Sequence, residues 1–240
     1  MRAVVAYDGT DYQGFQRQAN GPTVQQALET ALAQVTQEAI TVLAAGRTDS
    51  GVHAVGQVIA FDTDWRHGIG DLLRAMNAVL PDDIAVQRLG KTAPSFHPRY
   101  DARSRRYRYT LYNAPLRCPL NRRYSLHVST LLDRAAMEEA ARSLVGEHDF
   151  AAFGQPPQGN VTVRRVLAAG WGGEPPRMTF EIEANAFLYR MVRSIVGTLL
   201  RVGRGEMSVE QFVEVLASRE RSRAGQTAPP HGLCLMEVTY

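Results

Sequence analysis

Short strand-like apolar runs, several of them in pairs, are mixed with amphipathic helical patterns along the whole chain, and this mixture limits the possible fold more than any other feature. The first run, 2–7, ends at the turn pair Asp8-Gly9, and Thr23 then begins a helix with one apolar face. We expect further strands near 40–45, 55–61, 84–89, 105–113, 162–170, 177–184 and 233–239, and helices near 70–79, 132–144, 187–202 and 208–217. Because strand pairs are mixed with helices, the sequence predicts an α+β fold with helices packed on a mostly antiparallel sheet.

The stretch 91–98 contains two prolines and is the best candidate for a link between two halves of the chain. A length of 240 residues suits one large domain or two small fused ones. We therefore expect one α/β half at 1–98 and a second at 99–240.

Composition limits where such a chain works and what it binds. No apolar run approaches the ~20 residues needed to cross a bilayer, and the polar N-terminus is not a signal peptide. Cys118 and Cys234 form no C-x-x-C pair, which fits a reducing cytoplasm. Lys91 is the only lysine among 27 basic residues, and arginine pairs bidentately with phosphate and stacks on bases. Codon bias in a GC-rich genome explains most of that ratio, but not where the arginines cluster.

One candidate site is the loop GRTDSGVHA, 46–54, between two expected strands. Asp49 lies in its middle, and Arg47 precedes it by two residues. Loops on a rigid scaffold commonly carry function, yet an aspartate on a short turn usually bonds only to nearby backbone N–H groups. Spacing alone leaves both readings open.

A second candidate is the segment 99–124, in which cations and aromatic rings are interleaved. In a strand, Arg105 and Tyr107 share one face, while Arg106 and Arg108 share the other. Cations for phosphates beside rings for stacking are what unpaired RNA bases require, so the whole cluster favours nucleic acid. Its eight arginines are 99, 103, 105, 106, 108, 117, 122 and 123, and its five tyrosines are 100, 107, 109, 112 and 124.

The third candidate lies in the helical pattern of 185–204, NAFLYRMVRSIVGTLLRVGR. Arg193 falls at the boundary of its broad apolar face. A cation at such an edge usually extends to solvent, but a buried guanidinium needs a carboxylate partner.

Other chemical machineries are missing from the sequence. The six histidines show no H-E-x-x-H spacing, and two distant cysteines make no zinc set. No G-x-G-x-x-G or G-x-S-x-G motif is present. We therefore expect chemistry by side chains, with no cofactor and no metal.

These motifs together resemble the tRNA pseudouridine synthase A family (TruA), nearly from end to end. The resemblance begins at Tyr7-Asp8-Gly9-Thr10 and includes GRTDSGVHA, Phe96-His97 and Arg106-Tyr107. It continues through NAFLYRMVRSIVG and ends in Ala228-Pro229 and Gly232-Leu233. Several separated motifs in the same order are far more specific than any single loop.

The resemblance implies isomerisation of uridine to pseudouridine at positions 38 to 40 of the tRNA anticodon stem-loop. Asp49 matches the essential aspartate, and Arg47 the arginine that helps displace the base. Tyr107 matches the tyrosine that stacks on the uracil, and Arg193 the arginine paired with the aspartate, so we expect Arg193 to keep Asp49 ionised. The implied fold is the pseudouridine synthase fold, two α/β halves sharing a sheet with a central cleft, in a homodimer.

Two other classes of function compete with this reading. A non-catalytic RNA-binding module would explain 99–124 but gives no reason for Asp49, a negative charge on an RNA-facing loop. A hydrolase of phosphorylated small molecules would need a second carboxylate or a metal near Asp49, and the sequence offers neither.

Overall fold

A computed structural model of the chain describes residues 1–156 and 159–240, which divide into two compact units. The first unit comprises 1–103 together with 234–240, and the second comprises 104–233. The C-terminal residues 234–240 therefore belong to the first unit, whereas the expected division at residue 98 placed them in the second half.

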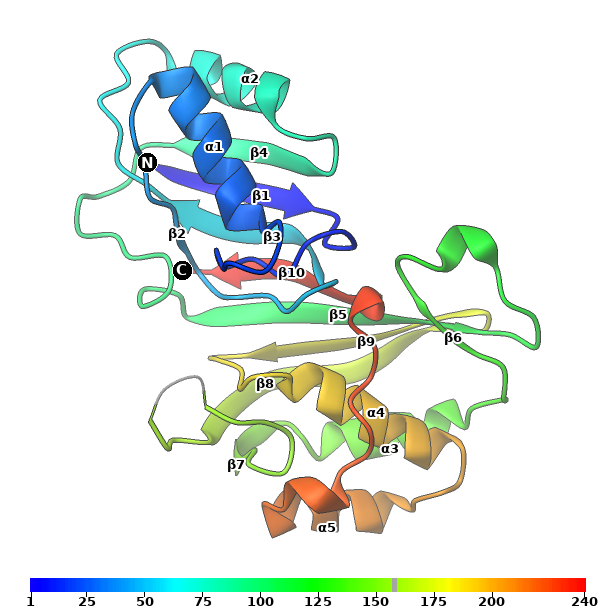
Figure 1. Ribbon diagram of the computed structural model, residues 1–240. Coiled ribbons are helices and arrows are strands. Elements are labelled where there is room, and N and C mark those ends of the chain that lie inside the picture. The colour runs from blue at the N-terminus through cyan, green and yellow to red at the C-terminus, as the bar shows by residue number, and fades with distance from the viewer. Residues whose placement is uncertain (157–158) are drawn as a thin grey trace. The chain divides into compact units, whose positions relative to one another are not determined.

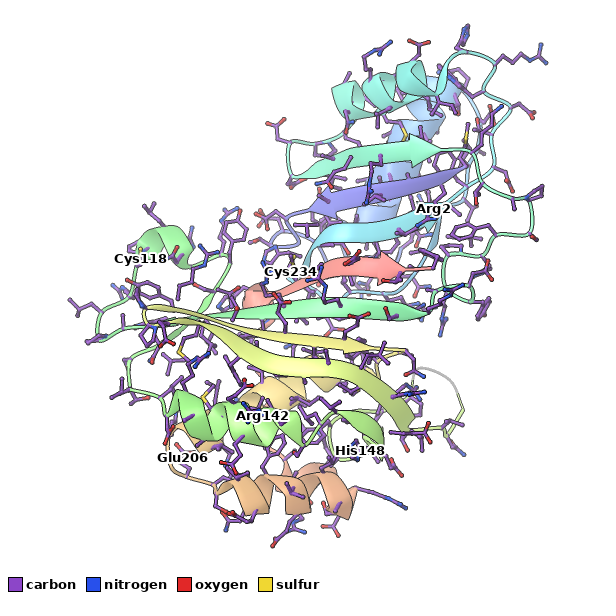
Figure 2. The ribbon with its side chains drawn as sticks, turned by 180° about the vertical axis from the view of Figure 1, so that it is seen from behind. Arg2, Cys118, Arg142, His148, Glu206 and Cys234 are labelled. Carbon is purple, nitrogen blue, oxygen red and sulfur yellow. The ribbon has the colours of Figure 1, made fainter. Side chains whose placement is uncertain are left out.

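The first unit is a sheet with two helices on one face (Figure 1). Its strands run in the order β4-β1-β3-β10; β2 also pairs with β3, and the pairings are antiparallel except for the parallel pair of β10 with β3. Figure 2, from behind, shows the strands in front of α1, so α1 covers one face of this sheet. The elements are β1 (Arg2–Tyr7), α1 (Val24–Thr36), β2 (Leu43–Ala44), β3 (His53–Ala60), α2 (Ile69–Val79), β4 (Ile84–Gly90) and β10 (Leu233–Thr239).

Helix α1 begins where the sequence predicts. The hydroxyl of Thr23 accepts a hydrogen bond from the backbone N–H of Gln26, which satisfies one of the free donors of the first turn. Its apolar stripe is buried through Val24, Leu28 and Leu32, each fully excluded from water. The Thr23 cap and the burial of the apolar stripe therefore both favour a helix that begins at Val24.

The second unit is a sheet in the order β5-β9-β8-β7, with β6 beside β5. Helices α3 and α4 pack on each other, and α5 packs on both of them (Figure 1). The elements are β5 (Ser104–Asn113), η1 (Pro119–Asn121), β6 (Leu126–Val128), α3 (Arg134–Arg142), β7 (Gly146–Asp149), β8 (Val163–Glu174), β9 (Arg177–Ala184), α4 (Met191–Gly203), α5 (Val209–Ser218), η2 (Arg221–Arg223) and η3 (Pro230–Gly232).

The alternation predicted for β5 is confirmed by its antiparallel register with β9. Tyr109 lies opposite Phe180 in the core, and both side chains are fully buried. Arg108 lies opposite Glu181 on the other face. The period of two therefore places Tyr107 and Tyr109 on one face and Arg106 and Arg108 on the other, which we call the charged face of β5.

The α+β class is confirmed, but two expected elements differ in extent. The helix expected from about 187 begins only at Met191, because Arg190 has a left-handed backbone (φ 60°) and Tyr189 pairs with Gln155. The strand expected over 40–45 shrinks to Leu43–Ala44, the part that pairs with β3.

Candidate active site

The loop that carries Asp49 joins β2 to β3 and alternates between exposed and buried residues. Arg47 and Ser50 are exposed, Thr48 is only 6% exposed, and Asp49 between them is partly exposed. The loop therefore presents a cation and a carboxylate to solvent, while its threonine faces the protein interior.

The backbone of this loop is held on both sides of Asp49 by the polar segment that follows β1. Phe15 N–H donates to the carbonyl of Thr48 (3.1 Å), and Gly51 N–H donates to the carbonyl of Tyr12 (3.3 Å). The Ser50 hydroxyl donates to the same Tyr12 carbonyl (3.2 Å). Because Thr48 and Ser50, the neighbours of Asp49, are both bonded to this one segment, the backbone that carries the carboxylate has little freedom.

Gly14 lies directly under the loop, where a side chain has no room. Its φ is +90°, and a Cβ added there would come within 2.7 Å of the Thr48 carbonyl oxygen. Glycine is therefore required both by conformation and by close approach.

Tyr12 is itself anchored, so it can serve as a fixed point for the loop. Its hydroxyl donates to the carboxylate of Asp83 at 2.6 Å. Burial, followed by the hydrogen bond and charge of Asp83, raises the pKa of the Tyr12 hydroxyl, which stays protonated.

In the second unit, Tyr107 lies on β5 opposite Ile182 and is partly exposed. The ring of Phe187 meets it edge-on, with centroids 5.0 Å apart and planes at 86°. A perpendicular aromatic neighbour at this distance restricts the tilt of the Tyr107 ring.

The charged face of β5 is not a row of isolated cations. Arg106 and Arg108 both reach the carboxylate of Glu181 on β9, at 3.3 and 2.6 Å. Burial acts to raise the pKa of Glu181, but hydrogen bonds and charge from Arg108 and Arg106 outweigh it, so the pKa is lowered. Sequence reasoning missed Glu181, whose only signal was its place in an alternating strand.

Arg193 lies in the first turn of α4 and is partly buried. Its Nε–H donates to the carbonyl of Ala228 (2.8 Å), and Ala228 N–H donates back to the carbonyl of Arg193 (3.0 Å). The charge of Arg193 also lowers the pKa of Tyr109, against a larger rise from burial. The side chain is thus held in place by the segment 225–229 and does not simply extend to solvent.

This segment approaches α4 so closely that Gly197 is indispensable. A Cβ at Gly197 would lie 1.7 Å from the carbonyl oxygen of Gln226. Gly225 N–H donates to the buried hydroxyl of Thr198 (2.9 Å). The motif Ala228-Pro229, one of those that carry the resemblance, therefore lies in the segment that holds Arg193 in position.

The five tyrosines of the segment 99–124, whose cluster as a whole favours nucleic acid, lie in different environments. Tyr109 is fully buried, and its hydroxyl donates to the carbonyl of Pro229 (2.8 Å). Tyr100 and Tyr124 are well exposed, at 73% and 51%. Tyr109 is thus a core residue, whereas Tyr107, Tyr100 and Tyr124 present ring surface.

Within the described residues, no three His, Cys, Asp or Glu side chains gather as metal ligands. In that same part of the chain, none of the helices has the length and apolar character needed to span a membrane.

Two residues beneath the loop, Tyr7 and Gln57, were not predicted as part of the site. The signals in the sequence were the place of Tyr7 in the motif Tyr7-Asp8-Gly9-Thr10 and a glutamine inside the apolar run VGQVIAF.

Comparisons of the sequence with a family model and with curated relatives agree with the resemblance read from the motifs. A family model described as tRNA pseudouridine synthase matches residues 3–101 and 140–240. A protein of Chloroflexus aurantiacus named tRNA pseudouridine synthase A is 49% identical over 242 residues, covering 99% of this chain and 87% of that protein. One of the same name from Geobacter sulfurreducens is 42% identical over 241 residues, covering 100% and 99%. A solved structure described as a Cbf5-Nop10-Gar1 complex aligns with a TM-score of 0.39 and 15% identity, covering 98% of this chain and 49% of that one.

Proposed function

This chain belongs to the tRNA pseudouridine synthase family, and we propose that it isomerises uridine at positions 38 to 40 of the tRNA anticodon stem-loop. It is accordingly an RNA-modifying isomerase, and Asp49 is its catalytic carboxylate. The observation that supports this most strongly is the partly exposed Asp49 on a loop whose neighbouring peptides are bonded to the scaffold.

The reaction exchanges one bond of the nucleoside for another without gain or loss of atoms. The bond between ribose C1′ and uracil N1 breaks, the uracil turns, and a bond from C1′ to C5 forms; C5 loses a proton and N1 gains one. Asp49 acts in its ionised form, either as a nucleophile toward sugar or base, or as the base that removes a ribose proton. A fixed carboxylate meets the demand that attacking groups be aligned before the bond breaks.

Three further residues bind the RNA. Flipping the target nucleotide out of its stack costs a few kcal/mol, which contacts to the displaced base must offset. Arg47, exposed beside Asp49, takes the place of the displaced base, and Tyr107 stacks on the uracil. Arg193, whose Nε–H donates to the Ala228 carbonyl, is the arginine that pairs with the catalytic carboxylate.

The working form is a homodimer in the cytoplasm, in which one tRNA contacts both chains. This part of the proposal rests on the family resemblance and on cysteine usage. Sedimentation of the purified protein tests it: a mass near the 26.5 kDa of one chain would contradict the dimer.

The experiment that tests the reaction uses unmodified tRNA transcripts with uridine at positions 38 to 40. Wild type and Asp49→Ala are incubated with them without metal or cofactor, and pseudouridine is mapped by chemical labelling. We expect pseudouridine with wild type alone, while both proteins bind the tRNA. If both bind but neither forms pseudouridine, the chain is a non-catalytic RNA-binding module.

A further inference from the structure

Two buried polar side chains lie directly beneath the catalytic loop. Tyr7 at the end of β1 is 4% exposed, and Gln57 in the middle of β3 is fully buried. The Tyr7 hydroxyl lies 2.8 Å from the hydroxyl of Thr48, and Gln57 Nε2 donates to the carbonyl of Gly46 at 2.9 Å. These two bonds hold the residues on either side of Arg47, so that Arg47 faces outward.

The donor and acceptor of each of these hydrogen bonds can be assigned from the Gly46 carbonyl. The Gly46 carbonyl can only accept, so the Gln57 amide nitrogen must face it. That nitrogen also donates its second hydrogen to the Tyr7 oxygen at 3.4 Å. Tyr7 therefore accepts from Gln57 and must donate its own proton to Thr48, although either hydroxyl could donate in an isolated pair.

The amide oxygen of Gln57 helps to explain why a glutamine is present at this position. Gln57 Oε1 is buried and has no hydrogen-bond partner among the described residues. A buried polar atom without a partner is unfavourable, and an apolar residue of similar size would avoid that penalty. Gln57 is thus accounted for by its two N–H donors, which connect the loop to the sheet.

We propose that Tyr7 and Gln57 are positioning residues for the reaction, forming a buried relay from Gln57 through Tyr7 to Thr48 that aims Arg47 and Asp49. The inference rests on the proposed function. The relay is uncharged, because burial raises the pKa of the Tyr7 hydroxyl more than its hydrogen bonds to Thr48 and Gln57 lower it. It fixes the geometry of the attacking group and makes no contact with RNA.

A single-turnover experiment with matched variants tests this role. Tyr7→Phe removes one hydroxyl and keeps the ring that packs near Phe15. The control is Tyr240→Phe, which removes a hydroxyl that donates to the Pro98 carbonyl (2.8 Å) in the same unit. We expect Tyr7→Phe to lower the single-turnover rate about 10- to 100-fold with unchanged tRNA affinity, since small misplacements have effects of that size. Tyr240→Phe should match wild type in both.

A second pair of variants separates positioning from general damage to the fold. Thr48→Ser keeps the acceptor hydroxyl and should retain the rate, while Thr48→Val should lose about as much as Tyr7→Phe. The double variant Tyr7→Phe with Thr48→Val should be no slower than either single variant, because both remove the same bond. If Tyr7→Phe does not fold, the two Thr48 variants still test the relay.

The outcomes distinguish the inference from the proposed function. A wild-type protein that forms no pseudouridine overturns both. An active wild type with Tyr7→Phe as fast as Tyr240→Phe overturns the relay alone. A Tyr7→Phe protein whose tRNA affinity falls as much as its rate also overturns it, because the residue would then act in binding.

Discussion

The loop around Asp49 in the first unit and the charged face of β5 in the second are fixed by opposite means. Thr48, next to Asp49, bonds through buried, neutral groups, whereas Arg106 and Arg108 depend on half-exposed ion pairs with Glu181. Breaking a buried hydrogen bond between neutral groups leaves a polar group without a partner, which lowers the free energy of unfolding. Exposed ion pairs contribute little to that free energy and are screened by salt. The difference suggests that one region is built for exact geometry and the other for adaptable charge.

The largest effect on the free energy of unfolding is expected from a variant that tests whether close backbone packing, more than the ion pairs, stabilises the second unit. Gly197→Ala should lower the free energy of unfolding by about 3 kcal/mol or more, since its Cβ would overlap a backbone oxygen. Denaturant unfolding measures this.

Gly70→Ala is the matched helical control in the first unit. Gly70 is exposed in α2, and an added Cβ would meet only the end of the Arg74 side chain at 3.6 Å. The same substitution should therefore raise stability by about 0.5–1 kcal/mol. Equal effects of the two variants would contradict the close packing at Gly197.

An intermediate effect is expected from Tyr107, whose aromatic ring is proposed to stack on the uracil. Tyr107→Ala should weaken kcat/KM by about 5- to 150-fold, equivalent to the about 1–3 kcal/mol typical of base stacking. Tyr107→Phe keeps the ring and should remain close to wild type. A large loss in the phenylalanine variant would show that the hydroxyl, and not stacking, is what matters.

The smallest effect concerns the ion pairs of Glu181. Because its pKa is lowered in the folded state, its stabilising contribution is complete above its ordinary value of 4.5 and is lost as pH falls through the folded value. Glu181→Gln should therefore be less stable than wild type by under about 1 kcal/mol near pH 7, given its exposure. Thermal unfolding from pH 7 to 3 should show the two proteins converging; a constant gap would contradict a charge-based role.

Local patterns predicted most elements of the chain because those elements are specified locally. The Thr23 cap and apolar stripe define α1, and the period of two in β5 separates Tyr109 from Arg108. The start of the next helix was misjudged because Phe187 and Leu188 continue the apolar pattern. A left-handed Arg190 and the pairing of Tyr189 with Gln155 delay the helix to Met191, and neither is visible in periodicity.

The sequence by itself determined the α+β class, the loop of Asp49 and the aromatic strand of Tyr107, since each depends on neighbouring residues and on motif order. Only the tertiary structure brought Gln57 and Tyr7 under Thr48, Glu181 between two arginines, and Ala228 against Arg193. These partners are separated along the chain, and a contact of that kind is set by strand register and backbone packing. The residue pattern of a single segment therefore cannot predict such contacts.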